Sequence, residues 1–404
     1  MAALDVSSAS AVLKIYYSNQ RVQELMYKDA PLYAMIKKIK DFEGSSYPLP
    51  MRVTNPQGRS NTFSNAQAQK VPSNFKTFQL TRASDYSLAS ISTEAILASE
   101  SNPGAFLKLA TAEIDGALES LKRSLQWALY GDGSGALAAV ASVSSANPEV
   151  ITLSNVEDIV RFEVGQLLEA RNGATTRVFA TGVSTASVTA VDRDLGTVTV
   201  NVDNSGNTDT IVAGDTLNVV GDYNKKLTGL AGWIPATAPG ATPFFGVDRS
   251  IDVTRLAGVR IASTGKPLDE ALIDGARRSG REGGNPDHVF MNFSRYADLE
   301  KTLGSKIRYG EIEIGRITFK AIELPGPKGT MKIVADKDCP QDRIYGLQMD
   351  TWALYSLKEP VMIVDLDGNK MLREASADAF EVRCASYSQL GCDMPGHNFV
   401  LTFS

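Results

Sequence analysis

The 404-residue sequence has few of the residue types on which most catalytic sites depend. It contains only two histidines, His288 and His397, and three cysteines, Cys339, Cys384 and Cys392. His288 stands between an aspartate and an apolar run, where a structural histidine is much commoner than a catalytic one. The cysteines form no CxxC pair and are odd in number, so we expect structural thiols in a reducing compartment. No GxSxG, HExxH or Walker motif is present. We therefore predict a protein that is not an enzyme and has no cofactor or metal.

Long hydrophobic runs are also absent, and this bears on location. No apolar run approaches the roughly 20 residues of a membrane-spanning helix. The N-terminus MAALDVSSAS lacks the basic and apolar regions of a signal peptide. We therefore expect a chain that is made in a cytosol and has no membrane partner. The net charge of -5 and the lack of helix-turn-helix, zinc or RNP signatures exclude sequence-specific nucleic-acid recognition.

Several polar stretches could be mistaken for sites. The acidic loops at 203–209 and 365–369 offer oxygen ligands, but neither has the spacing of a calcium-binding loop, so we interpret both as solvated turns. Glu311 and Glu313 alternate with isoleucines, which predicts an exposed strand face. The GDGSG at 131–135 lacks the Lys-Ser/Thr of a phosphate loop and follows a helix, which favours a flexible connector.

One segment carries most of the acidity. Residues 147–222 contain eleven Asp or Glu, four Arg and no Lys, a local net charge of -7. The segment is rich in Val and Thr, and it has a glycine every seven to fourteen residues. Alternating runs such as TASVTAV and GTVTVNV are typical of half-buried strands. We predict a small all-β barrel or sandwich inserted into a host chain.

The host chain mixes helices and strands. Asn102 suits an N-cap and Pro103 a first helical position, and apolar residues then recur with a 3.6-residue period, which predicts a helix over 103–130. Further helices are expected at 247–263, 267–284 and 293–305, and strands at 288–292, 312–324, 330–335, 360–366, 379–392 and 397–403, with a hairpin turn at Asp367-Gly368. The fold class is therefore α+β.

An extended polar stretch precedes the long helix. Between Val53 and Lys70 the only large apolar residue is Phe63, whereas strand-like alternating runs lie on both sides. A lone two-stranded hairpin is marginal in water. Because the hairpin has no evident partner nearby in the sequence, we predict that it is supported by a neighbouring copy of the chain. The segment 12–40 before it carries a net charge of +4 and is broken at Pro31; an assembly role is favoured over weak contacts with phosphates.

The order of these blocks resembles the major capsid proteins of tailed bacteriophages with the Hong Kong 97-type shell fold. The blocks are an arm (LKIYYSNQRVQELMYKDAPLYAMIKKI), an extended loop (YPLPMRVTNPQGRSNTFSNAQ), a spine helix (PGAFLKLATAEIDGALESLKRSLQWALYGDGSG) and DHVFMNFSRYADLEKTLGS. They continue with FKAIELPGPKGTMKIVADKDCPQDRIYGLQMDTWALYSLKEPV and AFEVRCASYSQLG. None is a short diagnostic motif, and the order is more specific than any one block.

The resemblance implies a division of the chain. It predicts an N-terminal arm at 1–45, an extended loop at 46–85 and an inserted β domain at 147–222. A peripheral domain would comprise 86–146 with 223–248 and 336–385, including the spine helix 103–130, and an axial domain would comprise 249–335 with 386–404. The inserted domain is expected to project outward, because its acidity suits a position away from packaged phosphates.

The resemblance also implies function and partners. Copies would assemble as pentamers and hexamers into an icosahedral shell around double-stranded DNA, bound without sequence specificity. Because the arm begins almost at once, a separate scaffolding protein is expected, together with a portal protein and, optionally, decoration proteins. The subunit would assemble in the bacterial host cytoplasm and reside in the virion capsid.

The extended loop supplies the residues expected at contacts between subunits. These are Arg52, Arg59, Phe63 and Lys70, with the two arginines as partners for carboxylates of the next subunit. Some relatives form Lys-to-Asn cross-links, but a non-covalent role is favoured for Lys70. Two alternatives stay open: an encapsulin-type nanocompartment shell, and a carbohydrate-binding tail protein, which is disfavoured because 147–222 has only Phe162 and Phe179 as aromatic residues.

Overall fold

The structure is a computed structural model that describes residues 26–27, 29–94, 103–144, 148–202, 211–304, 307–314, 317–326, 328–365 and 370–403. The side chains of residues 103–110 are outside this description. The chain divides into two compact units. The first comprises Met1–Leu129 and Gly229–Ser404, and the second comprises Tyr130–Thr228. Each unit is described separately below.

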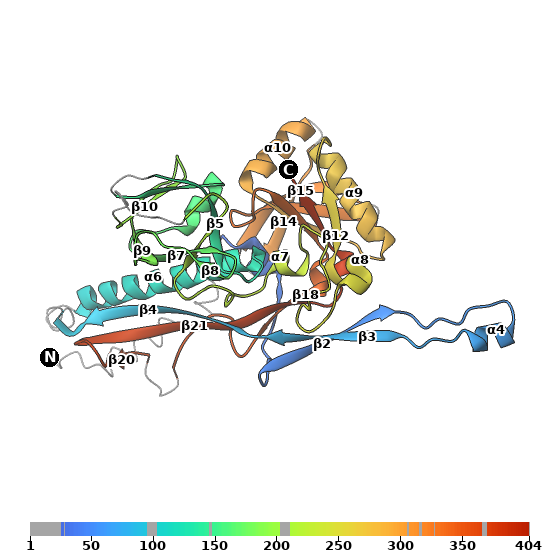
Figure 1. The fold of residues 1–404 in the computed structure, drawn as a ribbon, viewed down its shortest axis with the longest axis horizontal. Helices are drawn as coiled ribbons and strands as arrows, with labels where there is room; N and C mark the ends of the chain where they lie inside the picture. Colours follow the sequence, from blue (N-terminus) through green and yellow to red (C-terminus); the bar gives the residue numbers. More distant parts are fainter. Residues whose placement is uncertain are drawn as a thin grey trace. The chain divides into compact units, whose positions relative to one another are not determined.

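A six-stranded sheet and a long helix form one part of the first unit. The strands are β1 (Lys37–Ile39), β4 (Ala83–Ser92), β18 (Trp352–Ser356), β19 (Met362–Ile363), β20 (Leu372–Arg373) and β21 (Ala379–Cys392). The 14-residue strand β21 pairs with β4, β18, β19 and β20. β1 follows the short helix α3 (Pro31–Met35), which begins at Pro31, and pairs in parallel with β18. This sheet therefore joins segments that are far apart in the sequence (Figure 1).

The long helix α6 (Pro103–Tyr130) begins at the predicted proline and ends just before the GDGSG segment. Its buried side chains recur at three- and four-residue intervals, which places them on one face of the helix; they include Ile114, Leu118, Leu121 and Leu125. The Ser124 hydroxyl donates a hydrogen bond of 2.5 Å to Asp85 of β4, so the helix lies beside the long strands (Figure 1). Asn102, the predicted N-cap, is outside the described residues.

The second sheet of the first unit has seven strands of mixed direction. Their order is β12 (Val259–Ala262), β22 (Phe399–Thr402), β17 (Arg343–Leu347), β13 (His288–Met291), β16 (Thr330–Ala335), β15 (Ile317–Pro325) and β14 (Tyr309–Ile314). The helices α9 (Leu268–Arg281) and α10 (Phe293–Leu303) share a core with its strands. Phe399 illustrates the close packing, since a Cβ atom added at Gly275 of α9 would lie 2.6 Å from its ring.

The predicted helix over 247–263 is wrong. The segment instead forms the 3-10 turn η2 (Ser250–Asp252), the short helix α8 (Val253–Ala257) and strand β12. Gly258 separates α8 from β12 with φ +78°, a conformation that ends a helix readily only at glycine. An added Cβ there would also lie 2.5 Å from Ile234. The other predicted helices and the strands β13, β14, β15, β16, β21 and β22 are present, whereas 360–366 contributes only the two-residue β19. The Asp367-Gly368 turn is outside the described residues.

The second unit is a closed antiparallel β-barrel. Its strands are β5 (Ala136–Val143), β6 (Val150–Leu153), β7 (Leu167–Asn172), β8 (Thr175–Thr176), β9 (Thr185–Asp192), β10 (Thr197–Val200) and β11 (Thr216–Val219). They follow the order β11-β5-β6-β10-β9-β7-β8, and an additional pairing of β11 with β7 closes the ring. The unit includes more residues than the compositionally distinct segment 147–222, because β5 forms one wall of the barrel. Phe162 and Phe179 are both fully buried in it.

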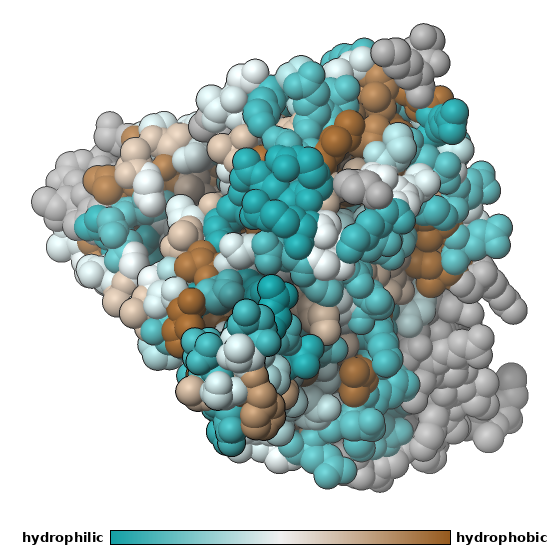
Figure 2. Space-filling view, turned by 90° about the vertical axis from the view of Figure 1, so that its right-hand side faces the viewer, coloured by the Kyte–Doolittle hydropathy of each residue, from teal (hydrophilic) through white to brown (hydrophobic). Residues whose placement is uncertain are grey.

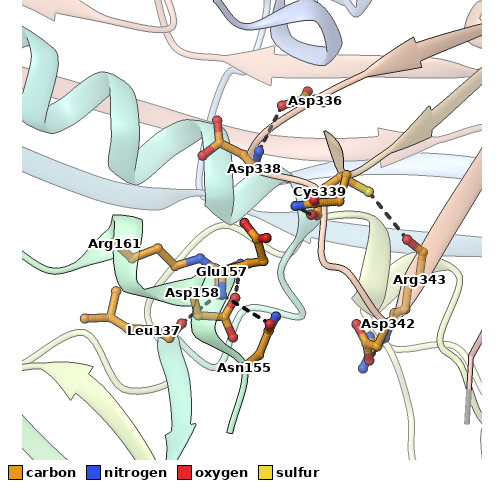
Figure 3. A network of polar contacts seen from close by, with 11 residues as sticks. Leu137, Asn155, Glu157, Asp158, Arg161, Asp336, Asp338, Cys339, Asp342 and Arg343 are labelled. Atoms are coloured by element: carbon orange, nitrogen blue, oxygen red, sulfur yellow. Dashed lines mark hydrogen bonds and ion pairs between the residues drawn. The ribbon is translucent and has the colours of Figure 1, made fainter. Parts of the chain in front are cut away.

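Two polar clusters hold the barrel together. Asp215 is fully buried and accepts hydrogen bonds from Asn172 at 2.8 Å and from the Val212 backbone at 2.9 Å. It also forms an ion pair of 2.9 Å with Arg177. Elsewhere, the 3-10 turn η1 (Val156–Arg161) is capped by Asn155, whose side chain accepts from Glu157 N at 3.2 Å (Figure 3).

The GDGSG segment is not the flexible connector that we expected. The Ser134 carbonyl accepts hydrogen bonds from Asn224 N at 3.0 Å and from Asn218 Nδ2 at 3.1 Å. Gly135 has φ +76°, and a Cβ atom there would lie 2.6 Å from the Asp222 carbonyl oxygen. The glycines therefore allow the chain to pack closely against the return segment of the same unit.

The three cysteines are free and buried. The Cys339 thiol contacts the Arg343 carbonyl oxygen at 3.6 Å (Figure 3). Burial raises the pKa of the Cys384 thiol to about 12. These environments fit the structural thiols predicted from the sequence. In the described part of the chain, no helix is long and apolar enough to cross a membrane.

Candidate assembly surfaces

The extended loop is a hairpin whose base belongs to the core of its own chain. Strands β2 (Ser46–Thr54) and β3 (Asn74–Thr81) form a separate two-stranded sheet. Its inward-facing side chains Leu49, Met51, Val53, Phe78 and Leu80 are buried. The expectation that this hairpin lacks support within its own chain is therefore wrong for its base.

An aromatic cluster supports the base of the hairpin. Phe78 packs against Trp233 with ring centroids 5.2 Å apart, and Trp233 lies 5.2 Å from Phe244. The indole nitrogen of Trp233, in the short helix α7 (Leu230–Trp233), donates to the Leu390 carbonyl at 3.0 Å. The backbone adds a further link, because Gln79 N donates to the Phe245 carbonyl at 2.9 Å. The hairpin is thus tied to residues more than 150 positions away.

Arg249 fastens this cluster. Its guanidinium lies 3.8 Å from the Phe244 ring centroid and donates to the carbonyls of Gly232 at 2.8 Å and Trp233 at 3.1 Å. Burial lowers the pKa of Arg249 to about 10. A buried guanidinium is tolerated here because carbonyl oxygens and an aromatic face replace part of its hydration. This cluster was not predicted from the sequence, where the only indication is the apolar pair Phe244-Phe245 within a Pro- and Gly-rich loop.

The tip of the hairpin is a folded element of its own. Gln57 and Val71 exchange backbone hydrogen bonds of 2.9 and 3.1 Å, and the six-residue helix α4 (Phe63–Ala68) lies between them. Gly58 packs so closely that an added Cβ would lie 3.0 Å from Lys70 Cα. Figure 1 shows α4 at the far end of the hairpin from the sheets. The tip therefore presents its side chains on a defined backbone.

Exposed aromatic and basic residues lie toward the tip. Phe63 is 82% exposed, and Val71 and Phe75 are also exposed. From residue 44 to residue 84 the sequence has five cationic residues and no Asp or Glu. Figure 2 faces the side from which the tip points at the viewer, and shows hydrophobic residues as small patches in a mainly hydrophilic surface. Aromatic residues are enriched in protein–protein interfaces, which makes Phe63 a candidate contact residue.

All four predicted contact residues lie on this exposed part. Phe63 begins α4, Arg59 and Lys70 lie on either side of the tip, and all three are exposed. Arg52 is exposed on β2, opposite Phe75 and close to where the buried base begins. The backbone at Gly58, next to Arg59, packs against Lys70, whereas Arg52 lies on β2. The two other cations of residues 44–84, Lys76 and Arg82, are half-buried, and the Arg82 guanidinium donates to the Phe42 carbonyl at 3.3 Å.

The remaining candidate residues have local roles. His288 contacts Asp287, with 3.1 Å between Nδ1 and Oδ2, and Asp287 also accepts from Met349 N at 2.9 Å. Burial lowers the pKa of His397. Glu311 and Glu313 are exposed on β14, as predicted. Within the described residues no group of side chains could hold a metal ion. The loop at 203–209 and most of 365–369 are outside the description.

Comparison with solved structures identifies the fold. A chain of the cyanophage A-1(L) capsid asymmetric unit is similar over 92% of this chain and 92% of that chain, with a TM-score of 0.52 and 12% sequence identity. The capsid of the empty GTA particle (TM-score 0.47, 9% identity, covering 93% and 90%) and the holo-SrpI encapsulin of Synechococcus elongatus PCC 7942 (0.44, 9%, 93% and 88%) are less similar. This chain thus has the Hong Kong 97-type capsid fold with an inserted β domain, as predicted.

Part of the chain also matches a known protein family. Residues 216–370 match the model described as SU10 major capsid protein. No curated protein matches the chain. Together with the fold, the family match confirms the resemblance to tailed-phage major capsid proteins and supports a major capsid protein of the phage type.

Proposed function

We propose that the chain is the shell subunit of a tailed-phage head, and that its copies assemble as pentamers and hexamers into an icosahedral shell around double-stranded DNA. The observation that carries this proposal is the hairpin, whose base is fixed in the subunit core and whose exposed tip bears Phe63 among cations. A preformed tip loses little conformational entropy on docking, which favours association.

The mechanism is adhesive. Each subunit contributes its tip to a neighbour and receives a tip in turn, so contacts that are weak singly become strong in a closed shell. Arg52 and Arg59 pair with carboxylates of the adjacent subunit, and Lys70 contributes its charge without a covalent bond. The proposal includes the division of the chain into an N-terminal arm, an extended loop, a peripheral domain, an inserted β domain and an axial domain.

The proposal includes partners and location. A scaffolding protein and a portal protein take part in assembly, which occurs in the bacterial host cytoplasm, and the mature shell holds DNA without reading its sequence. The acidic barrel projects outward, where its negative charge does not oppose packaged phosphates. Decoration proteins are an optional further partner.

Assembly is tested by removing the tip while keeping its base. Replacing residues 55–73 by an Asn-Gly turn joins the paired residues Thr54 and Asn74 through a two-residue hairpin. We expect an unchanged unfolding transition of the subunit, because the buried side chains of the hairpin remain, and the loss of large particles in analytical ultracentrifugation. If the shortened chain assembled like the full chain, the role given to the tip would be wrong.

The nature of the contents is tested separately. Particles isolated from the producing host are treated with nuclease, opened and analysed for nucleic acid. Protected double-stranded DNA is the expected content. Particles that hold a protein cargo and no DNA would instead indicate the encapsulin-type alternative. A single small sedimenting species under all assembly conditions would contradict the shell proposal itself.

A further inference from the structure

The barrel has an exposed apolar face that its own core does not use. The face comprises η1, the following residues 162–167 and the turn between β9 and β10 at residues 193–196. Its exposed apolar side chains are Val156, Val160, Val164, Leu167 and Leu195, with exposed fractions between 41% and 67%. We call it the η1 face.

The parts of the η1 face are held in contact with one another. An added Cβ at Gly196 would lie 3.0 Å from Val156 Cα, so the turn packs directly on η1. The Arg193 guanidinium donates to the carbonyls of Ile159 and Phe162, both at 3.4 Å. Arg161 is similarly fixed by the Leu137 carbonyl at 2.6 Å and by Asp158 at 3.1 Å (Figure 3). The face is therefore a defined surface.

The border of the η1 face is acidic. Glu157, Asp158, Glu163, Asp192 and Asp194 lie on η1 or beside it, together with the two arginines just described, which gives a net charge of -3. Both arginines are already engaged by carbonyl and carboxylate oxygens. Glu157 and Asp194 are exposed. An apolar centre with an acidic border is complementary to a partner with an apolar centre and a basic border.

The chain itself carries such a partner. The hairpin tip places Phe63 between Arg59 and Lys70, and no carboxylate lies within the 41 residues from 44 to 84. We propose that the η1 face of one subunit receives the hairpin tip of a neighbouring copy. This inference rests on the proposed shell function and specifies which surface of the neighbour the tip contacts. Pairing of two η1 faces is disfavoured because it would oppose two surfaces of the same charge.

Cross-linking tests the contact. The three native cysteines are buried, so cysteines introduced at exposed serines react selectively. One chain carries Ser64→Cys, beside Phe63 in α4, and a second carries Ser154→Cys, just before η1. Shells assembled from an equal mixture are treated with a short bismaleimide and separated on a denaturing gel. A cross-linked dimer that needs both variants is expected.

The matched control is Ser184→Cys, which is also an exposed serine of the barrel. Ser184 directly precedes β9, whereas Leu153 N, next to Ser154, donates to the Gly196 carbonyl beyond the other end of this eight-residue strand, so Ser184 and Ser154 are about 25 Å apart at the usual rise per residue. We expect no dimer when Ser184→Cys replaces Ser154→Cys. Equal cross-linking of both positions, or dimers formed by Ser154→Cys alone, would overturn the proposal.

A charge exchange supplies a second measurement. Glu157→Lys and Arg59→Glu should each raise the critical concentration for assembly about fivefold, the effect expected from losing one well-placed ion pair. The double variant should return it toward the value of the unmodified chain. Shells that form normally but show neither the cross-link nor this compensation would refute the assigned contact and leave the shell function intact. If the unmodified chain forms no shells, both proposals fail.

Discussion

Truncation of two phenylalanines of the same hairpin should affect different properties: the stability of the subunit for one and the assembly of subunits for the other. Phe78 is fully buried against Trp233 and Phe244, whereas Phe63 is 82% exposed on the tip. Phe78→Ala removes a core side chain of the isolated subunit. Phe63→Ala removes a side chain that, by our proposal, is buried only when a neighbour is present. The pair therefore separates the anchoring role of the hairpin from its docking role.

The magnitudes follow from these environments. Truncating a fully buried phenylalanine costs about 3–5 kcal/mol of unfolding free energy. An exposed substitution changes that free energy by about 0.5 kcal/mol or less. Burying the Phe63 side chain in a neighbour contributes about 2 kcal/mol per contact, so its loss should raise the critical concentration for assembly about 30-fold.

Two assays distinguish the outcomes. Urea unfolding of unassembled subunits should show a large decrease in stability for Phe78→Ala and no measurable change for Phe63→Ala. Light scattering against subunit concentration should show the shift in critical concentration for Phe63→Ala. An unaltered critical concentration for Phe63→Ala, or an equal loss of subunit stability in both variants, would refute this reasoning.

Three further predictions concern the subunit itself. Gln126 is buried in α6 and neither of its amide atoms has a hydrogen-bond partner among the described residues, so Gln126→Leu should raise the unfolding free energy by about 1 kcal/mol in urea titrations; a decrease would contradict this. Burial lowers the pKa of Lys38 to about 7, so above that pH the unfolded chain binds one proton more than the folded chain does. The unfolding free energy of the subunit should therefore rise from pH 7 to about 9, and this rise should be absent in Lys38→Met. Above pH 9 the buried Cys384 thiol, whose pKa is raised to about 12, acts in the opposite direction. Asp215→Ala leaves the partly buried Arg177 without its carboxylate and should destabilise the barrel by about 1–3 kcal/mol, seen as an earlier barrel transition in calorimetry, whereas Asp194→Ala should leave that transition in place.

Local patterns were sufficient for the regular elements. The Pro103 start and 3.6-residue period of α6 depend only on residues within the helix, as does the alternation of Ile312 with Glu311 and Glu313 on β14. The acidic, Val- and Thr-rich segment likewise indicated a separate β unit. These features could be predicted because each is determined by neighbours in the sequence.

Long-range contacts could not be predicted in the same way. β5 looks like part of the connector after α6, yet it belongs to the barrel because β6 and β11 pair with it. The segment 247–263 has the period of a helix, but Gly258 and the parallel pairing with β22 convert its second half to a strand. In both places tertiary pairing outweighs local preference.

The extended loop shows the same difference between what local sequence patterns predict and what long-range contacts determine. Its sequence by itself determined that a polar, cation-bearing hairpin could not form a core, and that Phe63 stood alone as an apolar side chain. Only the tertiary structure decided where the hairpin is anchored, because Trp233, Phe244 and Arg249 come from a segment more than 150 residues away. Burial of an aromatic side chain depends on what the folded chain brings next to it, and alternation along a strand shows which face is apolar without showing what covers it.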